Sequence, residues 1–219
     1  MPKYTPQSTQ SFLLSDSAMQ AASYSTYKNF QPQLSIGSSE LQAWKQRIIH
    51  FQNHLQIAPI DQQGDLFQVA QSTDDEASNE TPNEVVNTLD PFSLRRQNTE
   101  FWRWRFDDVG VAAMYFVIDY AAGTDGDKLL LYVGETVKCN QRWKGEHDCK
   151  RYLLNYRQAH YEHGLNSELG IAFWPHAPAA RQPRQTLESG LIYRWRSPFN
   201  KENWRFWNTP FVSGKESGL

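Results

Sequence analysis

The sequence predicts an α/β fold, in which a small central antiparallel β-sheet is flanked by helices and preceded by a largely disordered N-terminal arm. Three observations lead to this class. Apolar runs of strand length lie close together and are separated by a turn rich in Gly and Asp. Longer segments repeat apolar residues at helical spacing, and the first 38 residues, rich in Ser, Gln, Thr and Tyr, show little periodicity.

Composition divides the chain into two parts. The 219 residues include eight tryptophans and are 39% hydrophobic, which is enough for one well-packed domain with extensions. Residues 1–95 carry 5 Lys and Arg against 10 Asp and Glu, whereas residues 96–219 carry 17 against 14. A phosphate-rich partner would favour the second half. We therefore expect an acidic, mostly disordered arm over 1–95 and a folded domain over 96–213.

The chain shows no signal for secretion or membrane insertion. Cys139 and Cys149 are the only cysteines, too few for a disulfide scaffold in a chain of this size. The first twenty residues lack a charged start followed by an apolar core, and no apolar run approaches the roughly 20 residues that span a bilayer. These features predict a cytoplasmic protein with no membrane partner.

Within the arm, residues 39–57 are predicted to form an amphipathic helix. Ser39 can cap its start, and apolar residues recur at helical spacing at Leu41, Trp44, Ile48, Phe51 and Leu55. This apolar face has to be covered, either by the folded domain of the same chain or by a protein partner. Residues 61–90 look like an acidic linker, with a short structured piece at 66–69.

The folded domain is expected to begin with strands. FWRWRF, residues 101–106, alternates aromatic and basic side chains, as a strand with one wet face does. VAAMYFVIDY, residues 111–120, and LLLYV, residues 129–133, are two further strands joined by the Gly/Asp turn at 121–128. The pattern fits an antiparallel hairpin or a three-stranded meander.

The remaining elements alternate between helix and strand. Residues 150–163 have helical character, and His160 and His163 are expected to be exposed on it. LGIAFWP, residues 169–175, is a short strand ended by its proline. Residues 184–196 form a helix that ends before Pro198, because the residue preceding a proline disfavours helix.

One acid in the last helix needs a partner. Ile192 and Trp195 follow Glu188 by four and seven residues, so Glu188 shares their apolar face. A carboxylate in that position requires compensation for the lost water. The structural explanation is an ion pair with an arginine such as Arg142, and the functional one is a bound cation.

Polar residues recur in an ordered series of elements over roughly residues 110–204. Ala113-Met114-Tyr115 lies in one expected strand and Tyr132-Val133-Gly134 at the end of the next, Arg142 follows in a helix, Glu188 lies in a later helix, and Asn200 comes twelve residues after it. This ordered set of five polar positions resembles the GIY-YIG nuclease superfamily, which has Gly-Ile-Tyr at the first of these motifs and Tyr-Ile-Gly at the second. The first motif keeps only its tyrosine, and Glu135 occupies a position where many members have lysine.

The resemblance implies a metal-dependent endonuclease that hydrolyses phosphodiester bonds, with DNA as the expected substrate. Tyr115 and Tyr132 would help to activate the attacking water, and Arg142 would neutralise the scissile phosphate. Glu188 would hold a single Mg²⁺ or Mn²⁺ ion, and Asn200 would orient Glu188 or a metal-bound water. His147, five residues after Arg142, is a weaker candidate for a general base.

A basic and aromatic segment near the C-terminus is the candidate nucleic-acid-binding surface. It interleaves three aromatic residues, Trp195, Phe199 and Trp204, with four basic ones: Arg194, Arg196, Lys201 and Arg205. The alternative function is a non-catalytic module that retains the fold and binds nucleic acid or protein. A second alternative is an adaptor that works through the 39–57 helix and does not need Glu188.

Overall fold

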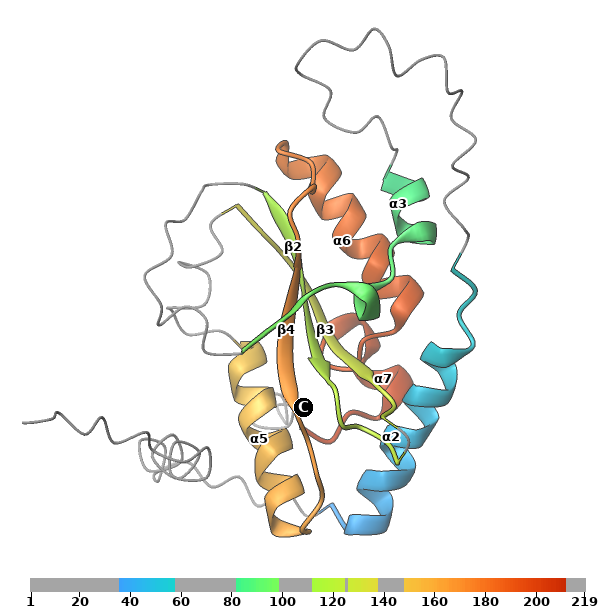
Figure 1. The fold of residues 1–219 in the computed structure, drawn as a ribbon, viewed down its shortest axis with the longest axis vertical. Helices are drawn as coiled ribbons and strands as arrows, with labels where there is room; N and C mark the ends of the chain where they lie inside the picture. The colour runs from blue at the N-terminus through green and yellow to red at the C-terminus, as the bar shows by residue number, and fades with distance from the viewer. Residues whose placement is uncertain (1–35, 58–81, 99–111, 125, 138–147, 212–219) are drawn as a thin grey trace, which may run out of the picture. The chain divides into compact units, whose positions relative to one another are not determined.

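The computed structural model describes residues 36–57, 82–98, 112–124, 126–137 and 148–211. Residues from Leu34 onwards form one compact unit. Its elements (Figure 1) are α2 Ser38–Asn53, α3 Pro82–Thr88, η1 Pro91–Ser93, β1 Arg96–Asn98, β2 Ala113–Asp119, β3 Leu129–Thr136, α5 Asp148–Glu162, β4 Leu169–Trp174, α6 Arg181–Trp195, η3 Lys201–Asn203 and α7 Trp204–Trp207. The predicted class, an antiparallel sheet flanked by helices, is confirmed. The strand predicted at 101–106 and the structured piece predicted at 66–69 lie outside the described residues.

The sheet has the strand order β1-β4-β2-β3, and every neighbouring pair is antiparallel. The hairpin of β2 and β3 is therefore confirmed, and its Gly/Asp turn contains Gly126 at a φ of 77°. A meander that places a strand from 101–106 beside β2 is wrong, because β3 and β4 occupy both edges of β2. The local pattern could not reveal that β4, which follows α5 in the chain, would pair with β2.

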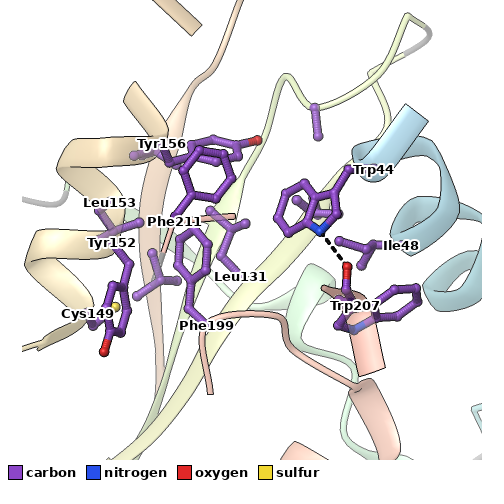
Figure 2. Close-up of a cluster of buried hydrophobic side chains, with 14 of the residues drawn as sticks. Trp44, Ile48, Leu131, Cys149, Tyr152, Leu153, Tyr156, Phe199, Trp207 and Phe211 are labelled. Atoms are coloured by element: carbon purple, nitrogen blue, oxygen red, sulfur yellow. Dashed lines mark hydrogen bonds between the residues drawn. The ribbon is translucent and has the colours of Figure 1, made fainter. Parts of the chain in front are cut away.

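Helices cover both faces of the sheet, so β2 is buried along its whole length. Its alternate side chains enter two different cores. Tyr115 and Val117 join the first core, which unites α2, α5 and the segment after α6. Met114 and Phe116 join the second core, which is built with α3 and α6. Figure 2 shows part of the first core, between α5 and α2.

The helix predicted at 39–57 runs over Ser38–Asn53 and packs into the domain. Leu41, Trp44 and Ile48 are almost completely buried in the first core, and the Trp44 indole donates a hydrogen bond of 3.1 Å to the carbonyl of Trp207 (Figure 2). The apolar face is thus covered from within the chain, which leaves it unavailable for the adaptor alternative. The boundary expected at residue 95 followed the acidic composition, but the buried stripe of α2 places this helix in the same unit as the sheet.

The predicted acidic linker contains a helix that the sequence did not reveal. α3 packs on α6, and Val86 lies over Gly190. A Cβ atom on Gly190 would come within 2.6 Å of a Val86 methyl group, so this glycine permits the close approach of the two helices. α6 itself begins at Arg181, three residues before its predicted start.

A polar cluster is buried where α2, β2 and α5 meet. The Tyr156 hydroxyl donates to Asp119 over 2.7 Å, and Lys45 Nζ lies 2.9 Å from His160 Nε2 and 3.7 Å from Asp119 Oδ2. His160 Nδ1 lies 2.7 Å from the Tyr156 carbonyl, which only accepts, so Nδ1 carries the proton and Nε2 accepts from Lys45. The predicted exposure of His160 is wrong: 1% of its surface is accessible. Burial, followed by the Lys45 charge, lowers the pKa of His160 to about 4.

No described helix combines the length and the apolar character that crossing a bilayer requires.

Candidate active site

Two tyrosines from neighbouring strands stack beside a glycine. Tyr115 on β2 and Tyr132 on β3 have ring centroids 5.9 Å apart and ring planes inclined by 26°. The strand register places Tyr115 opposite Gly134. A Cβ on Gly134 would lie 2.3 Å from Tyr115 Cζ and 2.4 Å from its hydroxyl oxygen. Glycine is required here because the Tyr115 ring lies across the backbone of residue 134.

The two tyrosines differ in their access to solvent. Tyr115 is fully buried, whereas Tyr132 is partly buried. Phe173 on β4 contacts the Tyr115 ring, with centroids 6.3 Å apart. Tyr115 therefore acts as a support that fixes Tyr132, which is the member of the pair that solvent reaches.

The Tyr132 hydroxyl is kept protonated by its surroundings. Burial raises the pKa of Tyr132 well above its ordinary value, and the neighbouring ionisable groups of Tyr115, Cys149 and Glu188, together with a hydrogen bond to Tyr115, raise it further. Glu188 of α6 is one of the groups that raise this pKa. The candidate site combines the tyrosine pair of β2 and β3 with this acid.

Glu188 lies at the edge of the buried face of α6. Ile192 and Trp195 are buried in the second core, whereas Glu188 is only half-buried. Mg²⁺ keeps several waters and needs only one or two protein carboxylates, so a single half-buried carboxylate is enough to hold it. Across the described ranges no three His, Cys, Asp or Glu side chains gather as a metal cluster. An ion at Glu188 would draw its other ligands from water and substrate oxygens.

Arg142 and His147, predicted to bind the phosphate and to serve as a base, lie outside the described residues. Both roles stay predictions.

The Asn200 side chain forms hydrogen bonds with the backbone of β3. Its Oδ1 accepts from the Val133 N–H over 3.0 Å and from the Ser197 hydroxyl over 2.7 Å, and its Nδ2 donates to the Val133 carbonyl over 2.9 Å. The side chain is buried, and its oxygen already accepts two hydrogen bonds. Asn200 was predicted to orient Glu188 or a metal-bound water. In the structure its side chain fixes the chain after α6 against β3.

Gln52 of α2 likewise forms hydrogen bonds with the backbone of β3, at Leu130. Its Oε1 accepts from the Leu130 N–H over 2.9 Å, and its Nε2 donates to the Leu130 carbonyl over 3.0 Å. Between these two amides, the Phe199 N–H donates to the Leu131 carbonyl. The outer edge of β3, which has no neighbouring strand within the described part of the chain, is thereby closed. Sequence reasoning missed Gln52, although a polar residue four positions after buried Ile48 was an available signal.

Glu135, the position where the superfamily often has lysine, forms an ion pair with Arg184 near the start of α6. Arg184 is 4% exposed, and its Nη1 also donates to the carbonyls of Pro178 (2.9 Å) and Ala179 (2.7 Å). The pair joins the end of β3 to α6, and so helps to set the position of Glu188 relative to Tyr132.

The predicted nucleic-acid-binding residues divide into two groups. Arg194 links α6 to α3 and to the segment after α2, because it donates to Asn87 and to the Gln56 carbonyl. The others, Arg196, Lys201 and Arg205, have partly or largely exposed side chains. Two of the interleaved aromatic residues, Trp195 and Phe199, are buried in the cores and unavailable to a ligand.

Comparisons of the chain with protein-family models, with curated proteins and with solved structures found no match.

Proposed function

We propose that this chain is a metal-dependent endonuclease with a GIY-YIG-like domain, and that it hydrolyses phosphodiester bonds in DNA. The observation that carries the proposal is the stacked pair of Tyr115 and Tyr132, with the Tyr115 ring packed over Gly134 on the neighbouring strand. The order of motifs in the sequence supports the same assignment. Gly134, whose place is required by Tyr115, adds a geometric reason for the Tyr-Val-Gly run.

The chemistry follows from the charges. In the proposed site a phosphodiester approaches the Glu188 carboxylate, and a bound cation would offset the repulsion between these two anions. Glu188 would hold Mg²⁺ or Mn²⁺ together with water and phosphate oxygens. When bound, the ion supplies neutralisation of the charge that develops on the leaving oxygen.

The other site residues have separate proposed roles. Tyr132, kept protonated by its raised pKa, donates a hydrogen bond to a phosphate oxygen or to the attacking water. Tyr115 is a positioning residue, because it is buried and holds Tyr132 through stacking. Arg142 and His147 are the proposed phosphate ligand and the weaker proposed base.

The test is nicking of supercoiled plasmid by the purified full chain with Mg²⁺ or Mn²⁺. Glu188→Gln preserves the shape of the side chain and removes its charge, and we expect it to lower the rate roughly a hundredfold or more. Glu162→Gln, at an exposed acid of α5, is the matched control and should leave the rate unchanged. EDTA should abolish the activity. Unchanged nicking by Glu188→Gln would refute the assignment of the site.

The complete burial of Tyr115 favours one other function, a non-catalytic module that binds nucleic acid. This module predicts that wild type and Glu188→Gln bind DNA equally and that neither nicks it with Mg²⁺ or Mn²⁺. The nuclease predicts nicking that depends on Glu188. The same plasmid assay, run beside a binding measurement, therefore separates the two functions.

A further inference from the structure

Two exposed aromatic rings share one arginine where α6 ends and α7 begins. Tyr193 and Phe206 are 68% and 55% exposed. The guanidinium carbon of Arg196 lies 4.2 Å from the centroid of the Tyr193 ring and 4.9 Å from that of Phe206. Three residues, separated in the sequence by up to thirteen positions, thus form one surface of two rings and a planar cation, which we call the aromatic platform.

The aromatic platform is held in place from below. Phe206 packs edge-on against Trp207, with centroids 4.7 Å apart and planes at 89°, and against Phe51 of α2 at 6.3 Å. Arg196 ends α6 in the left-handed conformation, with a φ of 49°, and its backbone N–H donates to the Ile192 carbonyl. Its carbonyl accepts from the Trp207 indole. Such anchoring lowers the conformational entropy that a ligand has to overcome.

The charge around the aromatic platform is positive. Arg196 donates over 3.5 Å to the amide oxygen of Asn203, which is uncharged, and among the described residues Arg194 likewise donates only to uncharged oxygens. Arg205 is exposed beside Phe206, and Glu202 is the exposed acid of the neighbouring η3. Guanidinium groups that hydrogen-bond to neutral acceptors keep their charge available to an anion.

We propose that the aromatic platform, Tyr193, Arg196 and Phe206, binds a single-stranded segment of DNA, with unpaired bases stacked on the rings and phosphates on Arg196 and Arg205. Bases stack on aromatic side chains only when their faces are free, and in a duplex the neighbouring base pairs cover those faces. The site would therefore prefer a frayed, displaced or overhanging strand to continuous duplex. This inference rests on the proposed function, since it names the form of DNA that the nuclease would engage.

The test is the fluorescence anisotropy of a labelled oligothymidylate of about 20 nucleotides, titrated with the full chain in EDTA at about 50 mM salt. Tyr193→Ala and Phe206→Ala should each weaken binding about tenfold, because one stacked base contributes that much. Tyr161→Ala, at a tyrosine of α5 that is 76% exposed, is the matched control and should bind as wild type does. The duplex of the same length should bind more weakly than the single strand.

Two further variants keep the test independent of folding defects. Tyr193→Trp enlarges the ring and should bind the oligothymidylate at least as tightly as wild type. Arg205→Ala should reduce the slope of log affinity against log salt by about 0.7, the value for one phosphate contact on a single strand. Alanine variants that bind like wild type, or a duplex that binds more tightly than the single strand, would overturn the proposal.

Binding in EDTA also separates this proposal from the proposed function. Nicking that requires Glu188, combined with binding that ignores Tyr193 and Phe206, would overturn the aromatic platform and leave the nuclease standing. Binding that requires both rings, without nicking by wild type, would support the aromatic platform and refute the nuclease.

Discussion

Mild acid should destabilise this protein through His160. The imidazole is buried among Lys45 from α2, Asp119 from β2 and Tyr156 of its own helix, with His163 near the end of that helix. Its Nδ1–H donates to a carbonyl and its Nε2 accepts from Lys45, so protonation would place two cations face to face. The folded state therefore holds His160 neutral, and its pKa falls to about 4.

The sign and size of the effect follow from linkage. The ordinary histidine pKa is about 6.5, so between pH 6.5 and pH 4 the unfolded chain binds a proton that the folded chain does not. The contribution of His160 to stability is complete above pH 6.5 and is lost progressively as the pH falls towards 4. The difference of the two pKa values corresponds to roughly 3 kcal/mol in the free energy of unfolding.

The assay is urea denaturation of wild type and His160→Gln at closely spaced pH values between 7 and 4. Gln can still accept from Lys45 and donate to the Tyr156 carbonyl, and it does not titrate. Wild type should lose about 3 kcal/mol more than His160→Gln across this range. His54→Gln, at an exposed histidine, should keep the wild-type slope. Parallel curves for wild type and His160→Gln would refute the assignment of a neutral, buried imidazole.

Three further substitutions test the frame of the candidate site by urea denaturation. Gly134→Ala should lower the free energy of unfolding by about 1–3 kcal/mol and slow any nicking, because the new methyl group displaces the Tyr115 ring. A variant as stable as wild type would contradict the conclusion that glycine is required at this position. Asn200→Ala should cost about 2–4 kcal/mol, since both backbone groups of Val133 lose their partner; a loss below about 0.5 kcal/mol would mean that water replaces the amide. Glu135→Lys, which introduces the residue common in the superfamily, should cost about 2 kcal/mol or more because it opposes Arg184; a stable variant would show that the ion pair is dispensable.

Some of the site could be predicted because its signals are local. LLLYV, residues 129–133, predicts a buried strand, and β3 contains these five residues but continues through Gly134 to Thr136. The spacing from Glu188 to Ile192 and Trp195 places the acid beside an apolar helix face, as α6 has it. The residues next to Gly134 in the sequence do not explain why glycine is needed there. The need arises from the ring of Tyr115, which is nineteen positions earlier and on another strand.

The roles of other residues could not be predicted, because one residue type can have several different functions. Asn200 was predicted to orient Glu188 or a metal-bound water, but its side chain bonds to the backbone of Val133, 67 positions away. Trp195 and Phe199 looked like members of a basic aromatic surface, yet they are buried, while Tyr193 and Phe206 face solvent. The residue type alone does not tell whether an aromatic side chain will be buried in the core or exposed to a ligand.

The one-dimensional pattern was sufficient for α2, α5, α6, β2, β3 and β4 and for the order of polar residues along them, since alternation and helical spacing involve only near neighbours in the chain. It did not reveal α3 or the short strand β1. Tertiary structure alone decided that α2 belongs to the domain, that Gln52 and Asn200 close the edge of β3, and that Lys45 meets His160 across 115 positions. Those contacts depend on which faces pack together once the sheet has formed. The acidic composition of residues 1–95 did not predict the position of α2; its buried side, with Trp44 in the core, determined where the helix lies.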